Sequence, residues 1–303
     1  ATRVPEGPGP EYETLGSLGT LLLHGNLAGV AKANELCNRF GLDTISTGST
    51  IAWAMEAFQH GALTAADTDG VELTWGNTTA ILKAIEAIGL KQGRLGDLLS
   101  LGSRRAAEKL GKGSQEYAMH VKGLDLPMHH PRVFHGLALA YATLPHGASH
   151  NEGGFNQRGA DTSVEEWVKS TIETMRPKAV YNSAVLCSFT LNGTSTQFLA
   201  DTLSSVTGEQ YTEEGLREFA DRLYLMRWAF NLRAGQTPAR NVLPQRIVDQ
   251  MTERDARWAD DWPVGLSTYY GMRGFDEKGY PTADALRSAG LDDMASDMVY
   301  WTR

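Results

Sequence analysis

Apolar residues recur at helical spacing along most of the chain. Ala, Val and Leu repeat every three to four positions in Leu27–Phe40, and Gly41 follows as a C-terminal cap. In Ala80–Ile88 the isoleucines lie on one face, Asn77 precedes the segment as an N-cap and Gly89 ends it. The pattern therefore predicts two amphipathic helices in this part of the chain.

Longer helical patterns follow in the second half. Thr162 opens a predicted helix that runs to Met175, with Glu165 at capping-box spacing, and Ala179–Thr207 is a longer, more buried helical region. The best amphipathic helix is predicted over Glu213–Ala234. Its apolar stripe consists of Leu216, Phe219, Leu223, Met226 and Phe230.

Shorter apolar runs complete the prediction, and alternation typical of strands is scarce. Further helices are expected at Ile51–Gln59 (capped by Ser49 or Thr50), Leu95–Leu99, Arg104–Leu110 and Gly136–Thr143, with a loop at Lys122–Arg132. The fold class is therefore mostly α, with two packed helical domains. We place the boundary near Gly111–Ser114 and predict domains at 1–113 and 114–303.

The composition is that of an ordinary globular protein: 42% of residues are hydrophobic and 21% are charged. The net charge of −8 argues against a general nucleic-acid binder. No apolar run reaches the roughly 20 residues of a membrane helix. Ala1–Tyr12 lacks the pattern of a secretory signal, so we expect a cytoplasmic protein without a membrane partner.

The two cysteines, Cys37 and Cys187, are too few for a disulfide framework. They leave open two buried thiols, one bridge, or a role as a ligand. The sequence begins with Ala and not with Met, which suggests a piece of a longer polypeptide.

Two six-residue segments share one pattern: an amide, three residues, Leu and a side chain that can act as a ligand. They are Asn38-Arg39-Phe40-Gly41-Leu42-Asp43 and Asn182-Ser183-Ala184-Val185-Leu186-Cys187. From spacing alone the first is a helix that ends at Gly41, with Asp43 opening the next turn. Cys187 alone reads as a small apolar residue.

These segments, together with others in the same order, resemble the carboxy-terminal half of the tungsten-dependent aldehyde:ferredoxin oxidoreductase family. The matching stretches are 9–16, 36–46, 75–77, 121–123, 126–127, 130–132, 147–150, 182–187, 243–246, 269–276 and 279–282. Each match is weak, but the shared order and spacing are specific. The resemblance covers the whole chain.

The resemblance implies a cofactor and a set of residues that hold it. Family members bind tungsten, or molybdenum, through two pterins, and a [4Fe-4S] cluster passes electrons to ferredoxin. The pterin-binding positions map to Asn38, Gly41, Leu42 and Asp43 in the first motif. In the second motif they map to Asn182, Leu186 and Cys187, and Cys187 is also the expected fourth cluster ligand.

The sequence departs from the family pattern at several positions. Asn38 and Asn182 stand where the pattern has Asp, so each motif gains a donor that needs a partner. Val185 replaces a glycine, and His146 stands where the family often has Arg. The CxxCxxxC run and the β-rich first domain of the family are missing from these 303 residues, so we expect the chain to need that domain, or a separate chain, as a partner.

The catalytic Glu and His of the family map to Glu13 and His150. A buried carboxylate beside a metal cofactor can act as a general base, and a histidine can hydrogen-bond the substrate oxygen or shuttle its proton. Without the resemblance, Glu13 reads as an exposed residue of a polar entry loop. His150 reads in the same way as a solvated loop histidine.

The sequence therefore predicts the cofactor-clamping half of an enzyme that oxidises an aldehyde to the carboxylic acid, with electrons leaving to ferredoxin. The competing hypothesis is a cofactor-free structural or binding subunit for a chain that carries the first domain. A third alternative is a parent enzyme that reduces a thioester or an aromatic ring. The choice between tungsten and molybdenum, and a homo-oligomeric state, stay open.

Overall fold

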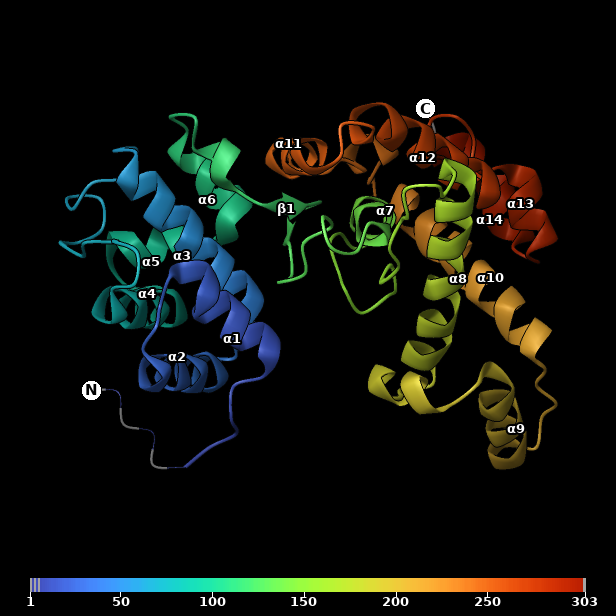
Figure 1. Cartoon of the computed structure of the whole chain (residues 1–303), viewed down its shortest axis with the longest axis horizontal. Helices are drawn as coiled ribbons and strands as arrows, with labels where there is room; N and C mark the ends of the chain where they lie inside the picture. Colours follow the sequence, from blue (N-terminus) through green and yellow to red (C-terminus); the bar gives the residue numbers. More distant parts are fainter. Residues whose placement is uncertain (1, 3, 5, 302–303) are drawn as a thin grey trace. The chain divides into compact units, whose positions relative to one another are not determined.

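The protein is almost entirely helical in the computed structural model, which describes residues 2, 4 and 6–301, without the side chains of 191 and 299–301. The described residues form fourteen α-helices, four short 3-10 helices and one two-stranded sheet (Figure 1). This confirms the predicted fold class. None of the described helices is both long and apolar enough to cross a bilayer.

The chain divides into two compact units. Unit 1 is Ala1–Met128 with Pro244–Arg246, and unit 2 is His129–Leu243 with Ile247–Arg303. The predicted boundary near residue 113 therefore lies inside unit 1. A division by contacts does not test which segments fold on their own, so the domains at 1–113 and 114–303 stay a prediction.

Unit 1 is a cluster of helices around one core. Its elements are α1 (Tyr12–Leu18), η1 (Thr20–Leu22), α2 (Leu27–Phe40), α3 (Thr44–Gln59), α4 (Thr78–Leu90), α5 (Gly93–Leu99), α6 (Gly102–Leu110), η2 (Ser114–Tyr117), β1 (His120–Val121) and β2 (Leu124–Asp125). Trp53 lies in the core and donates from Nε1 to the carbonyl of Ser114 at 2.9 Å. The two strands form an antiparallel hairpin, in which Val121 pairs with Leu124.

Unit 2 is built on the long helices α8 and α10, which pack against each other. Its elements are α7 (Gly136–Thr143), α8 (Val164–Ser183), η3 (Ser188–Gly193), α9 (Thr196–Thr207), α10 (Glu213–Arg233), η4 (Pro238–Arg240), α12 (Trp258–Met272), α13 (Ala283–Ser288) and α14 (Asp292–Trp301); α11 (Gln245–Arg254) begins within the segment that belongs to unit 1. Every residue of α7 is buried, and the core also contains Trp167 and Trp228.

Several helix boundaries differ from the prediction. Helix α4 runs through Gly89 to Leu90, and the left-handed Lys91 is its C-cap in place of Gly89. Helix α3 begins at Thr44, because the side chain of Asp43 accepts from the backbone N–H of Ser46 and forms the N-cap in place of Ser49 or Thr50. The capping box of α8 uses Ser163 with Glu166, one residue after the predicted pair. The predicted helical region 179–207 is interrupted after Ser183 and resumes as α9.

Other elements were not predicted. The expected loop at 122–132 begins with the turn of the β1–β2 hairpin. Glu13 lies in α1 and is 3% exposed, so its interpretation as an exposed loop residue is wrong. Helices α11 to α14 follow the segment that the sequence shows only as a loop with Arg and Pro.

Candidate functional site

The first motif forms the junction between α2 and α3. Gly41 adopts the left-handed conformation with φ 66° and ψ 37°. The N–H of Gly41 donates to the carbonyl of Asn38 at 3.3 Å, and the N–H of Leu42 donates to the carbonyl of Cys37 at 2.8 Å. These two bonds close α2 as a Schellman motif. Asp43 then turns the chain into the first residue of α3.

The second motif has the same backbone structure. Val185 is left-handed with φ 58°, and its N–H donates to the carbonyl of Asn182 at 3.2 Å, while that of Leu186 donates to the carbonyl of Tyr181 at 2.9 Å. Cys187 precedes η3 with φ −66° and ψ 124°, close to the −66° and 126° of Asp43. The shared sequence pattern therefore corresponds to a shared cap.

The two caps differ at their left-handed residue. Glycine adopts this conformation without steric cost, whereas a β-branched residue does so rarely. The side chain of Val185 is also 90% exposed. The second motif therefore carries an isopropyl group where Gly41 leaves the backbone of the first motif open.

The amide of Asn182 has a partner for its donor. Its Nδ2 donates to the carbonyl of Asn151 at 3.2 Å, which leaves Oδ1 to accept, as a carboxylate oxygen would. The exposed amide of Asn38 makes no hydrogen bond to the part of the chain that the structure describes. Asn182 therefore keeps the acceptor function of the aspartate in the family pattern.

The two cysteines have opposite environments. Cys37 is fully buried, and burial raises the pKa of its thiol to about 12. Cys187 is exposed. Since the thiolate is the form that binds metals, the exposed Cys187 is the more accessible of the two thiols, and its role as a ligand stays a prediction.

In unit 1, α1 brings Glu13 near the first motif. The hydroxyls of Thr14 and Thr44, the residues next to Glu13 and Asp43, are 2.8 Å apart, and Ser17 Oγ donates to the carbonyl of Thr44 at 3.0 Å. Glycine at 48 allows this close packing, because a Cβ there would lie 2.6 Å from the backbone oxygen of Ser17.

The carboxylate of Glu13 is buried and accepts a hydrogen bond from the backbone N–H of Met128 at 2.8 Å. Burial, together with the charges of Glu13 and Glu11, raises the pKa of the neighbouring Tyr12 to about 12. Glu11 itself is exposed. Of the two glutamates, only Glu13 is buried, and its catalytic role stays a prediction.

In unit 2, the loop at 144–152 brings His150 near the second motif. Asn151, the residue after His150, is the one that accepts from Asn182. The ring of His150 lies 5.1 Å from that of His129 and 6.5 Å from that of Phe155. His150 is thus a packed residue of a short, hydrogen-bonded loop.

Arg227 lies on α10, and no motif or periodicity in the sequence singles it out. Its guanidinium donates to both carboxylate oxygens of Glu152, at 2.7 and 3.0 Å, and to Nδ1 of His146 at 2.8 Å. A guanidinium can only donate, so Nδ1 of His146 accepts and the ring proton lies on Nε2. The 3.6 Å separation of His146 and Glu152 is therefore not an ion pair.

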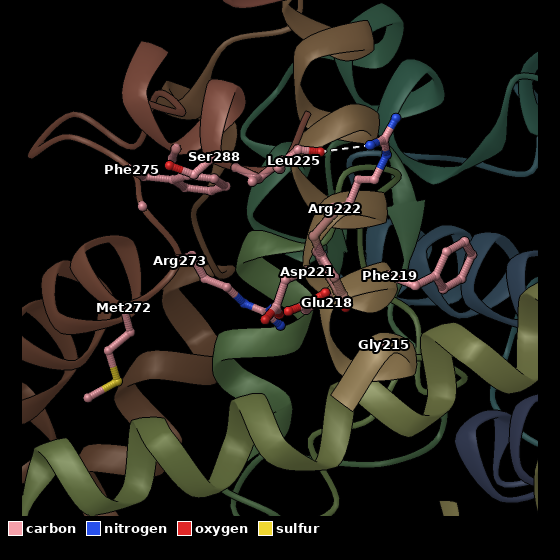
Figure 2. Close-up of a pocket in the computed structure, with 14 residues that line it drawn as sticks. Gly215, Glu218, Phe219, Asp221, Arg222, Leu225, Met272, Arg273, Phe275 and Ser288 are labelled. Carbon is pink, nitrogen blue, oxygen red and sulfur yellow. Dashed lines mark hydrogen bonds and ion pairs between the residues drawn. The ribbon is translucent and has the colours of Figure 1, made fainter. Parts of the chain in front are cut away.

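A second feature of unit 2 is a cavity of about 650 Å³ between α10 and the segment 272–289. Figure 2 shows Arg273 extended from its wall toward Asp221, to which it donates at 2.7 Å. Arg176 donates to the same carboxylate, and the ring of Tyr224 lies 4.3 Å from Cζ of Arg273. Since none of the predicted site residues lines this cavity, we assign its charges a structural role.

The residues of the two motifs suit a bis-pterin group and an iron-sulfur cluster in most respects. Asp43 is an exposed carboxylate, Asn182 keeps a free acceptor oxygen and Cys187 is an exposed thiol. Pterin rings present N–H donors, and clusters are held by thiolates. Val185 fits less well, because it places an exposed side chain where Gly41 leaves the backbone of the first motif open.

Comparison with known proteins gives one consistent result. Residues 1–291 match the family model described as aldehyde ferredoxin oxidoreductase, domains 2 and 3. Tungsten-containing aldehyde ferredoxin oxidoreductases of Pyrococcus furiosus and Thermococcus kodakarensis are each 34% identical to this chain, over 95% and 93% of it. The chain spans about half the length of these relatives, 49% and 48%.

A solved structure shows the same fold. The active site complex BamBC of benzoyl coenzyme A reductase aligns over 95% of this chain and 50% of its own, with a TM-score of 0.79 and 18% identity. A further relative from Pyrococcus furiosus, 28% identical over 94% of this chain, is named as the WOR-like subunit of an aliphatic sulfonate oxidoreductase.

Proposed function

The chain belongs to the aldehyde ferredoxin oxidoreductase family, of which it spans domains 2 and 3, and from this we propose that it forms the cofactor-clamping half of an aldehyde oxidoreductase. The reaction converts an aldehyde and water into the carboxylic acid, two protons and two electrons. Ferredoxin is the proposed electron acceptor.

One observation carries the proposal. In each unit, a hydrogen bond joins the neighbour of one candidate catalytic residue to a residue in or next to a cofactor motif. Thr14, next to Glu13, pairs with Thr44, next to Asp43; Asn151, next to His150, pairs with Asn182. A purely structural helical subunit has no need for this repeated arrangement.

The proposed roles of the residues follow from their chemistry. Asp43 and Asn182 would accept hydrogen bonds from the pterin rings, and Cys187 would bind iron. The bound metal would supply the two-electron redox chemistry. Glu13, held by the backbone of Met128, would take the proton of water or of the hydrated substrate, and His150 would hydrogen-bond the substrate oxygen.

A [4Fe-4S] cluster takes four thiolates, and this sequence offers one exposed cysteine. We therefore propose that the other ligands, and the domain that completes the site, come from outside these 303 residues.

The first test is elemental analysis of the purified chain for tungsten, molybdenum and iron, normalised to protein. Near-stoichiometric tungsten or molybdenum supports cofactor binding by the two motifs. In the complete protein, which includes the missing domain, Cys187→Ser is expected to lower the iron content, and Cys37→Ser is the matched control because its thiol is buried. Iron that is unaffected by Cys187→Ser would exclude this residue as a cluster ligand.

The second candidate function is a cofactor-free binding partner of a chain with the missing domain. It is favoured by the sequence itself, because the CxxCxxxC run of the family pattern is missing from these 303 residues. Absence of all three metals in the co-purified complex of this chain with a second polypeptide that contains the CxxCxxxC run would support it.

A further inference from the structure

The loop that carries His150 is anchored from two sides within unit 2. From α8, Asn182 donates to the backbone carbonyl of Asn151. From α10, Arg227 donates to Glu152 and to His146. The anchored residues lie before and after His150 in the sequence, so both ends of the loop are fixed to the two long helices of the unit.

The contact with Glu152 is the stronger of the two anchors. Glu152 is 8% exposed, and both of its carboxylate oxygens accept from the guanidinium in a two-pronged arrangement. Such bidentate pairs fix orientation as well as distance, and they are stronger than neutral hydrogen bonds. Removal of Arg227 would leave Glu152 buried without its cation, so the loop would have to move to rehydrate it.

The same guanidinium also fixes the other end of the loop. Its Nη2 donates to Nδ1 of His146 at 2.8 Å as well as to Glu152 at 3.0 Å. Arg227 therefore bridges residues on both sides of His150. A lysine carries the charge but lacks the planar fork that makes this bridge.

We propose that Arg227 is a positioning residue that holds the His150 loop, and with it the imidazole, in the orientation needed for the reaction. This inference rests on the proposed function only for the role of His150. In this proposal Arg227 acts through Glu152 and His146.

The test is NMR of the histidine ring and backbone amide signals in the full 303-residue chain. Arg227→Gln and Arg227→Lys are each expected to shift the His150 ring signals and to speed amide exchange at Asn151 by about tenfold, because loss of one anchor frees the loop. The matched control is Arg217→Gln. Arg217 is also on α10 but pairs with Glu173 and Glu213, so its variant should leave these signals unchanged.

Unchanged His150 signals in Arg227→Lys would overturn the proposal. Should Arg227→Gln fail to fold, Glu152→Gln tests the same contact with an isosteric side chain, and it too must shift the His150 signals. These measurements need no cofactor. If they succeed while His150→Ala keeps full aldehyde oxidation in the metal-loaded enzyme, Arg227 still holds the loop, but the proposed role of His150 and the link of this loop to the reaction are wrong.

Discussion

At the scale of single residues, Val185 adopts a conformation that costs a β-branched side chain about 1–2 kcal/mol. The side chain is exposed and gains little from packing to offset this cost. Local strain of this kind is often found at functional sites. Val185 is therefore a β-branched residue at a position whose backbone conformation favours glycine.

We predict that Val185→Gly stabilises the chain by about 1 kcal/mol, because glycine removes the strain at φ 58°. Urea unfolding measures the change. Val206→Gly is the control: Val206 is also exposed but lies inside α9, where glycine should destabilise by about 0.5 kcal/mol or less. Loss of stability in Val185→Gly would contradict the strain.

The two thiols should differ strongly in reactivity. We predict that a thiol reagent at pH 8 modifies one cysteine quickly in the folded chain and both in denaturant, because burial raises the pKa of Cys37 to about 12 while Cys187 is exposed. Mass spectrometry of the labelled peptides identifies the site. Fast modification that persists in Cys187→Ser would show that the reagent reaches Cys37, and the prediction would be wrong.

At the scale of elements, Asp125 joins three of them beneath the first motif. From β2, its buried carboxyl accepts hydrogen bonds from Ser103 on α6 and from the side chain of Ser46 on α3. The backbone N–H of Ser46 is the one that donates to Asp43 at 2.6 Å. The β1–β2 hairpin therefore stabilises the first turn of α3, where Asp43 is the N-cap.

Burial raises the pKa of Asp125 to about 6, above the value near 3.9 of an unfolded chain. The folded state therefore keeps this proton to a higher pH. The contribution of protonated Asp125 to the stability of the folded state is complete below about pH 4 and is lost as the pH rises through 6. We therefore compare the free energy of unfolding of Asp125→Asn with that of the native chain. We predict that the difference shifts in favour of the variant by up to about 3 kcal/mol as the pH rises from about 4 to above 6.

Urea unfolding at a series of pH values measures this difference. Asp67 is the control, because hydrogen bonds from Thr64 lower the pKa of its carboxyl, so Asp67→Asn should change relative stability in the opposite direction. If the difference in free energy of unfolding between Asp125→Asn and the native chain did not vary with pH, the raised pKa of Asp125 would be refuted.

The interruption after α8 shows which elements could not be predicted. A glycine at 185 would have marked the end of the helix, as Gly41 does for α2. Valine gives no such signal, so 179–207 reads as one helical region. Helix α12 was missed for a related reason: Pro263 lies within it, and its apolar residues do not keep to one face.

At the scale of the whole molecule, the sequence was sufficient for the helical fold class and the family, because these rest on patterns spread over the chain. The candidate site was only partly predictable. Residue types and spacing identify the motifs, but the contacts of Arg227 with Glu152 join positions 75 residues apart. No periodicity connects such positions, so only the folded structure reveals this ion pair.

The segment Pro244–Arg246 belongs to unit 1, although the residues before and after it in the sequence belong to unit 2. Arg246 donates to both carboxylate oxygens of Glu56, at 3.0 and 2.8 Å, within unit 1. We predict that Arg246→Gln speeds hydrogen exchange in peptides from the C-terminal half of α3 but not in peptides from α10, as mass spectrometry can measure.

Arg240→Gln is the control for this prediction, because Arg240 is close in sequence but belongs to unit 2. It should leave α3 unchanged. Equal effects of both variants on α3 would show that the ion pair has no specific role in unit 1.

The pairing of Arg246 with Glu56 across 190 residues also has a consequence for synthesis on the ribosome. At about 5–20 residues per second, the partner of Glu56 is made roughly 10–40 s after Glu56 itself. The same guanidinium lies over the ring of Tyr117 at 5.9 Å. Both contacts of Arg246 within unit 1 can therefore form only after residue 246 has been translated.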